Sequence, residues 1–203
     1  MFTKFSKQFH SIGQKIALPY IVFFELVLIC RMVSVYSTLP PKIDSIFSMI
    51  IMLLSGVIFL SHFLPMILEK KKIKIEYWLI VFIVILAIST LLNREYAFTE
   101  NIKLIIWQCI FFFCVFEVGR ENNKKLFTVF ETILLVVWSA LVLFSLYLFF
   151  ARVSFSTPVK SLYYGMRIGF FENRLYGIFV DPNYATTISL VCIIFALRKA
   201  IFN

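Results

Sequence analysis

Three cations recur at intervals of seven residues near the C-terminal end of the chain: Lys160, Arg167 and Arg174. The guanidinium group of arginine presents parallel N–H donors that match phosphate oxygens, and it stays charged at any relevant pH. On a helix this spacing would place all three cations along one stripe. Gly165 and Gly169 argue against one regular helix, since each weakens it by up to ~1 kcal/mol. These residue types would suit a phosphate or diphosphate group, if such a group is the target.

The residues after Arg174 can be interpreted from backbone geometry, as a turn followed by a helix cap. Gly177 permits a close backbone approach or a left-handed turn. Asp181 or Asn183 can cap the free amides of the helix that follows, with Pro182 restricting how the chain approaches it. An exposed helix N-terminus is a positive dipole end that suits an anion. The segment therefore predicts a second source of positive potential beside the arginines.

The segment from Arg174 to Ala185 combines an Arg-x-x-Gly motif with Pro-Asn just before the last apolar run. This arrangement resembles the junction motif of the O-antigen ligase and O-antigen (capsular polysaccharide) polymerase superfamily. The resemblance implies a membrane glycosyltransferase that polymerises or ligates undecaprenyl-pyrophosphate-linked glycan repeat units at the outer face of the cytoplasmic membrane. It also implies no cofactor, no nucleotide sugar and no bound metal. Arg174 and Arg167 would be catalytic, by neutralising the leaving diphosphate. The substrate-binding residues would be Arg174, Gly177, Asn183, Arg167 and Lys160.

The resemblance covers only the N-terminal half of such proteins, whose acceptor-positioning groups are expected in a later outer loop. The implied partners are an undecaprenyl-pyrophosphate-linked oligosaccharide, membrane lipid, and either other polysaccharide assembly proteins or a missing C-terminal half. Two alternatives stay open. One is a non-catalytic or truncated membrane protein that binds lipid-linked glycan, and the other is a small transporter that uses Glu25 as its coupling residue.

Composition places the chain in a membrane. Hydrophobic residues make up 61% and charged residues 15%, with a mean hydropathy of +0.92, whereas about a quarter of the residues in a soluble domain are charged. Continuous apolar runs of about 20 residues indicate helices rather than barrel strands. We expect an all-α polytopic protein, folded as a single helical membrane domain over 1–203 with about six transmembrane helices. The runs are approximately 16–37, 44–68, 77–93, 102–118, 127–151 and 184–202.

The formal charge of +9 is distributed as the positive-inside rule expects, which removes the argument for nucleic acid as a partner. Basic clusters at 70–74 and 120–125 fall on one side. The short loops on the other side hold only Lys42 and Arg94, with Lys103 at the edge of a run. We therefore expect a cytoplasmic N-terminus, a multi-pass arrangement and one long outer loop over 152–183. The resemblance implies that the membrane is the bacterial cytoplasmic membrane.

Glu25 and Arg31 are intramembrane polar candidates within the first run. A charge at the centre of a bilayer costs roughly 2.5–3.5 kcal/mol, so such residues indicate function by default. Six residues apart, the two side chains differ by ~120° around a helix, and we do not expect them to pair. Arg31 can extend its charge to the outer boundary. Glu25 is either protonated, satisfied by an Arg or Ser of another span, or part of a proton relay or substrate site.

Overall fold

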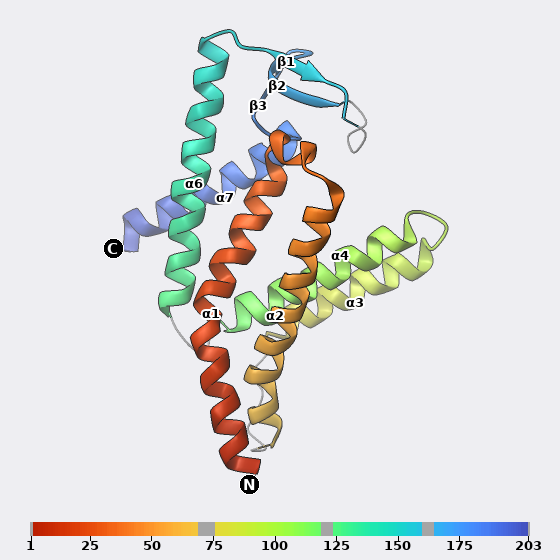
Figure 1. The fold of residues 1–203 in the computed structure, drawn as a ribbon, viewed down its shortest axis with the longest axis vertical. Helices are drawn as coiled ribbons and strands as arrows, with labels where there is room; N and C mark the ends of the chain where they lie inside the picture. The colour runs from red at the N-terminus through yellow and green to blue at the C-terminus, as the bar shows by residue number, and fades with distance from the viewer. Residues whose placement is uncertain (1, 69–75, 119–123, 160–164, 203) are drawn as a thin grey trace. The chain divides into compact units, whose positions relative to one another are not determined.

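The computed structural model describes residues 2–68, 76–118, 124–159 and 165–202, and Lys160 lies outside them. Figure 1 shows long helices and one small sheet. The helical elements are α1 (Phe2–Met32), the 3-10 helix η1 (Ser34–Thr38), α2 (Pro41–Leu68), α3 (Tyr77–Leu92), α4 (Phe98–Ile110), the π-helix η2 (Phe111–Phe116), α6 (Lys124–Phe150) and α7 (Pro182–Phe202). The strands are β1 (Phe155–Thr157), β2 (Met166–Phe171) and β3 (Arg174–Gly177).

Five of the helices are long and apolar enough to cross a membrane by length and composition. They cover 10–32, 41–68, 98–116, 125–150 and 182–201. The remaining expected span, the run 77–93, corresponds to α3, which has 16 residues. This is short of the ~20 that a hydrocarbon core requires. Its side chains are nonetheless apolar and mostly exposed, Leu92 by 80% and Trp78 by 64%. Apolar surface on this scale is typical of a protein surrounded by lipid.

The first helix differs most from its predicted bounds. It begins at Phe2 rather than near residue 16, because the polar N-terminal residues continue the helix without raising the hydropathy. It ends at Met32 rather than near residue 37, because Val33 leaves the helix and forms a β-bridge with Phe179. Residues 34–38 then form η1.

The chain divides into two compact units, and α1 and α2 contribute residues to both. Unit 1 comprises residues 1–21 and 49–127, and unit 2 comprises 22–48 and 128–203.

Unit 1 is built on a close approach of α1 to α2. A Cβ added to Gly13 would lie 1.9 Å from Ser61 Oγ, so only glycine fits there. Further along, Tyr20 is 1% exposed and its hydroxyl lies 2.6 Å from Ser55 Oγ. The thiol of Cys114, in the π-helix η2, donates to the carbonyl of Ser55 at 3.4 Å. Polar groups buried between these helices therefore satisfy one another.

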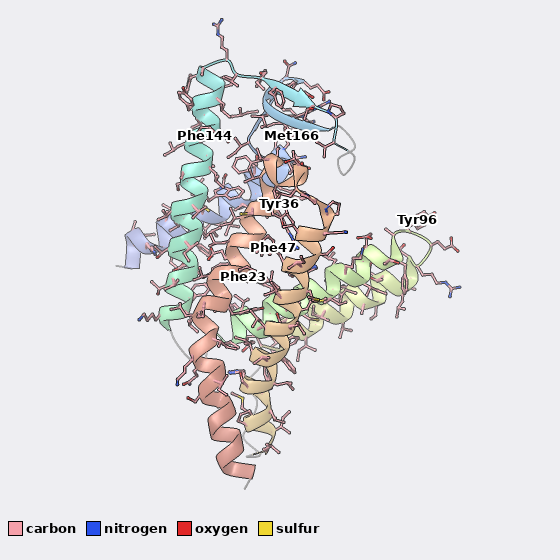
Figure 2. The ribbon with its side chains drawn as sticks, viewed as in Figure 1. Phe23, Tyr36, Phe47, Tyr96, Phe144 and Met166 are labelled. Atoms are coloured by element: carbon pink, nitrogen blue, oxygen red, sulfur yellow. The ribbon has the colours of Figure 1, made fainter. Side chains whose placement is uncertain are left out.

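Helices α3 and α4 form an antiparallel pair within unit 1, and Figure 2 labels Tyr96 in the turn that joins them. The turn closes through Ala97, whose φ of 49° is left-handed. Phe82 of α3 meets Phe112 of η2 edge to face, with ring centroids 5.8 Å apart. The pair is thus held by aromatic packing on one side and leaves its other apolar faces exposed.

Unit 2 packs the second half of α1 and the start of α2 with α6, α7 and the sheet. Phe23 and Phe47, labelled in Figure 2, meet edge to face at 5.9 Å. Trp138 is 1% exposed, stacks on Phe179 with centroids 4.8 Å apart and donates its indole N–H to Ser189 Oγ at 3.0 Å. The core of the unit therefore centres on one tryptophan of α6.

The expected long loop contains a three-stranded antiparallel sheet in the order β1-β2-β3, so the chain is mostly helical rather than all-α. Ser156 pairs with Arg167 in β1 and β2, and Phe171 pairs with Arg174 in β2 and β3. The helical stripe of cations considered from the spacing is therefore wrong: Arg167 and Arg174 lie on neighbouring strands. Figure 1 shows the sheet at the end of α6, where the chain leaves that helix.

Candidate functional site

The β2–β3 hairpin carries both arginines of the predicted phosphate site. Glu172 and Asn173 form its turn with φ values of 51° and 58°, the left-handed pair that a type I′ turn requires. Phe171 and Arg174 flank this turn as directly opposed partners, and opposed residues point to the same face of a sheet. Arg167 lies four residues before Phe171 on the same strand, with its guanidinium 5.8 Å from the Phe171 ring centroid. Phe171 thus links the two arginines: its ring contacts Arg167, and its register partner is Arg174.

Gly177 ends β3, and the structure confirms both roles predicted for it. Its φ is +59°, a left-handed conformation that favours glycine. A Cβ built on it would also lie 2.3 Å from the Cβ and the Oγ of Ser145 in α6. The next residue, Ile178, donates its N–H to Ser145 Oγ at 3.2 Å. The hairpin is therefore anchored directly on the surface of α6.

The backbone after β3 also binds the end of α1. The N–H of Ser34 donates to the carbonyl of Ile178 at 2.7 Å, and the N–H of Val180 donates to the carbonyl of Met32 at 2.9 Å. The Ser34 hydroxyl adds a bond to the carbonyl of Arg167 at 3.2 Å. These bonds satisfy backbone groups that the end of α1 would otherwise leave unpaired. They also fix the position of the sheet in unit 2.

Asp181 caps α7, as predicted from the Asp-Pro-Asn sequence. Its Oδ1 accepts a hydrogen bond from the N–H of Asn183 at 2.7 Å, and Pro182 occupies the first helical position. Asn183 itself is exposed and is not the capping residue. The cap and the β3 strand are joined by only three residues, 178–180. The hairpin arginines therefore lie on the segment that leads straight into this helix N-terminus.

Arg167 is bound within the hairpin. It forms an ion pair with Glu172 at 3.0 Å and donates to the hydroxyl of Tyr176 at 3.4 Å. Its guanidinium lies 5.6 Å from the ring centroid of Tyr176. The hydrogen bond to Glu172, and then that to Tyr176, raise the pKa of the Arg167 guanidinium above its ordinary value. Its charge is thus partly neutralised by a carboxylate that the sequence analysis did not assign to the site.

Arg174 differs from Arg167 in being exposed and forming no ion pair with any residue of the described ranges. Of the other predicted binding residues, Gly177 and Asn183 lie on the same stretch of chain, whereas Lys160 lies outside the described residues. The acids of the 152–183 segment are Glu172, bound to Arg167, and Asp181, bound to the α7 backbone. Arg174 is therefore the cation of the hairpin best placed to meet an external anion.

Glu25 lies in the part of α1 that belongs to unit 2. No side chain of the described residues forms a hydrogen bond with its carboxyl group. It is 2% exposed, and neither of its carboxyl oxygens accepts a hydrogen bond there. Of the alternatives considered for Glu25, a hydrogen bond from an Arg or Ser of another span is not found among the described residues. Glu25 and Arg31 do not pair, as their helical separation predicted.

Arg31 binds α2 instead of extending alone to the membrane boundary. Its Nε donates to Asp44 Oδ1 at 2.7 Å, and its terminal amino group donates to Ser48 Oγ at 2.6 Å. The Tyr36 hydroxyl donates to the same Asp44 oxygen at 2.8 Å. Burial, and then the bond to Asp44, raise the pKa of the Tyr36 phenol. Arg31 thus forms a network that joins the end of α1 to the start of α2.

The fold and this site define a class: a mostly helical protein, with five helices able to cross a membrane and a basic β-hairpin joined to the last of them. Comparisons with protein-family models, with curated proteins and with solved structures found no match.

Proposed function

We propose that the chain takes part in polymerising or ligating undecaprenyl-pyrophosphate-linked glycan units at the outer face of a bacterial cytoplasmic membrane, and that Arg174 binds the donor diphosphate. The observation that carries the proposal is the exposed Arg174 on an anchored hairpin that also holds Arg167, with Phe171 as the register partner of Arg174 and the ring contact of Arg167. Forked guanidinium donors suit phosphate oxygens. The apolar helices next to the sheet would accommodate the polyprenyl chain.

Charge stabilisation is the contribution we assign to the site. As a glycosidic bond to a diphosphate breaks, negative charge grows on the leaving oxygen, and a cation held near it in advance lowers the barrier. Rigid attachment matters here, and the Gly177–Ser145 contact and the bonds from Ile178 and Val180 supply it. Arg167 would support Arg174 from the neighbouring strand while it remains paired with Glu172.

The acceptor hydroxyl needs a general base, and we do not assign one in this segment. It contains no histidine, and its two acids are engaged in the ion pair with Arg167 and in the α7 cap. This observation favours a second candidate, in which the chain binds lipid-linked glycan without catalysing transfer by itself.

The test is to replace Arg174 in cells that make the polysaccharide and to examine the polymer ladder on gels. We expect Arg174→Ala and Arg174→Lys both to abolish the ladder, because lysine keeps the charge but lacks the fork. Arg152→Ala is the matched control, since Arg152 is an exposed arginine in the turn before β1. An unchanged ladder in Arg174→Ala would exclude the catalytic role.

Binding separates the two candidates. Native mass spectrometry of the purified chain with undecaprenyl pyrophosphate should show a complex that Arg174→Ala weakens and Arg152→Ala does not. Weakened binding with an intact ladder would favour the non-catalytic candidate. The absence of any complex with the wild-type chain would contradict both.

A further inference from the structure

Glu25 is a buried acid in unit 2 that the function proposed above does not use. Its side chain is 2% exposed, and neither carboxyl oxygen accepts a hydrogen bond from the described residues. The carboxyl lies beside the backbone amide of Leu134, whose N–H belongs to the helical bonds of α6. It also lies within electrostatic range of Cys192 in α7. Glu25 is therefore placed where α1 meets both α6 and α7.

The surroundings of Glu25 are apolar. Leu134 and Cys192 belong to the buried core cluster of unit 2, and so does Ile29. Ile29 is one turn further along α1 than Glu25, and residues four apart on a helix share a face. A charged carboxylate without a partner is very unfavourable in such surroundings, and a carboxyl placed there takes up a proton instead.

The ionisable groups of α6 and α7 offer no cation to Glu25. Glu131 of α6 is itself an acid, and it is paired with Arg198 of α7. Cys192 is a free thiol, which carries no positive charge in either protonation state. Lys199, at the end of α7, donates to a hydroxyl of α6. Neither helix therefore supplies an ion pair that would stabilise a charged Glu25.

The charged groups of α1 and α2 within unit 2 are also engaged elsewhere. Arg31, the nearest cation to Glu25 along α1, donates to Asp44 and Ser48 of α2. Lys42 is exposed in the first turn of α2. The ion pairs found among the described residues do not include Glu25. The helices of unit 2 thus favour the neutral, protonated form of this carboxyl.

The chain keeps this acid at a cost in stability. A buried polar group without a hydrogen bond destabilises a fold even when it is neutral. Departures from good packing that have no local compensation are expected at functional sites. A metal ion would need several ligands, and the described residues hold no cluster of three groups that could bind one. A proton, by contrast, needs only one carboxyl.

From these features we propose that Glu25 is a proton-binding site in the core of unit 2, and that release of its proton loosens the packing of α1 against α6 and α7. The site is independent of the hairpin arginines, since neither Arg167 nor Arg174 forms an ion pair with it in the described part of the chain.

Infrared spectroscopy of the full chain in lipid vesicles tests the first part of the proposal. Protonated carboxyl groups have a carbonyl stretch that is separate from the bands of the backbone and of charged carboxylates. At neutral pH, wild type should show this band, and Glu25→Gln and Glu25→Leu should both lose it. Glu131→Gln is the matched control, because it removes a buried acid that is paired, and it should keep the band. Arg174→Ala should also keep it, which separates this site from the hairpin.

The pH dependence of thermal unfolding tests the second part. An acid that holds its proton in the folded chain and releases it on unfolding lowers stability progressively as the pH rises. Wild type should therefore lose melting temperature relative to Glu25→Gln as the pH is raised from about 5 to about 9. Glu131→Gln should follow the wild-type trend.

Three results would overturn the proposal. The first is a carboxyl band that is absent from wild type or unchanged in Glu25→Gln. The second is a band that is lost in Glu131→Gln instead, which would assign the proton to Glu131. The third is a pair of melting curves for wild type and Glu25→Gln that shift in parallel with pH.

Discussion

Gly177 lies against Ser145 with no space for a side chain between them. A Cβ on Gly177 would come within 2.3 Å of both the Cβ and the Oγ of Ser145, and the φ of Gly177 is +59°. Two independent constraints, steric contact and backbone conformation, therefore exclude other residues at the point where the hairpin meets α6.

Gly177→Ala should accordingly destabilise the protein by about 2–4 kcal/mol, combining the cost of a left-handed alanine with that of overpacking. Trp138 lies in the core of the same unit, so its fluorescence during thermal unfolding is a suitable measurement. The control is Gly56→Ala, because a Cβ there meets nothing within 4 Å. A helical alanine should leave the melting temperature unchanged or raise it. Equal effects of the two changes would contradict the role given to Gly177.

The contact between Gly13 and Ser61 predicts a rescue. Gly13→Ala should lower the melting temperature, because the new methyl group would overlap Ser61 Oγ and Cβ. The Cα of Ser61 lies 3.8 Å from that position, which is an ordinary contact. Adding Ser61→Gly should therefore recover much of the stability, and a double-mutant cycle should give a coupling of about 0.5–3 kcal/mol. Strictly additive effects would show that the two helices do not meet at this pair.

Glu25→Leu should stabilise the protein. The carboxyl of Glu25 is buried without a hydrogen bond in the described part of the chain, and such burial costs about 1–3 kcal/mol. Leucine removes that cost at similar volume. Glu131→Leu is the matched comparison, since Glu131 is also buried, at 1% exposed, but one of its two carboxyl oxygens is paired with Arg198. In thermal unfolding, the Glu25→Leu variant should have a higher melting temperature than the Glu131→Leu variant. The reverse order would mean that Glu25 has a stabilising partner.

The cap of α7 gives a further prediction. Asp181→Ala removes the acceptor for the N–H of Asn183 and should cost about 0.5–2 kcal/mol. Asp181→Asn keeps an acceptor and should cost less. Thr186→Ala is the control, because that hydroxyl only binds the carbonyl of Pro182 within its own helix. Thermal unfolding with the three variants side by side would test the cap, and equal effects of alanine and asparagine would exclude it.

Hydropathy was sufficient to locate the apolar helices. The runs 77–93 and 127–151 differ from α3 and α6 by at most a few residues, because the transition from apolar to charged residues marks the end of a span. The boundary of α1 near Val33 was not predictable in this way. It depends on pairing with Phe179, which is remote in sequence.

The three-stranded sheet was not predicted from the sequence, for a related reason. Its strands have three to six residues, too few for a clear alternation of apolar and polar side chains. The sequence offered one signal, the residue types found in turns. Glu172-Asn173 stands between two aromatic stretches. Gly165, Gly169 and Gly177 lie on either side of it, and the structure gives all three a positive φ. The ion pair of Arg167 with Glu172 follows from that turn and could not be predicted without it. Asp181 was one of the two residues predicted to cap α7, because a cap depends only on neighbouring residues.

The backbone bonds from Ser34 to Ile178 and from Val180 to Met32 join the end of the first helix to the start of the last. Their partners are about 145 residues apart in the sequence, so during synthesis the carboxyl end of α1 must wait until residues 178–180 have left the ribosome. Such distant pairings are slow to form because a long loop must close first. The hairpin that carries Arg174 therefore becomes attached to α1 only after a long segment of the chain has been made.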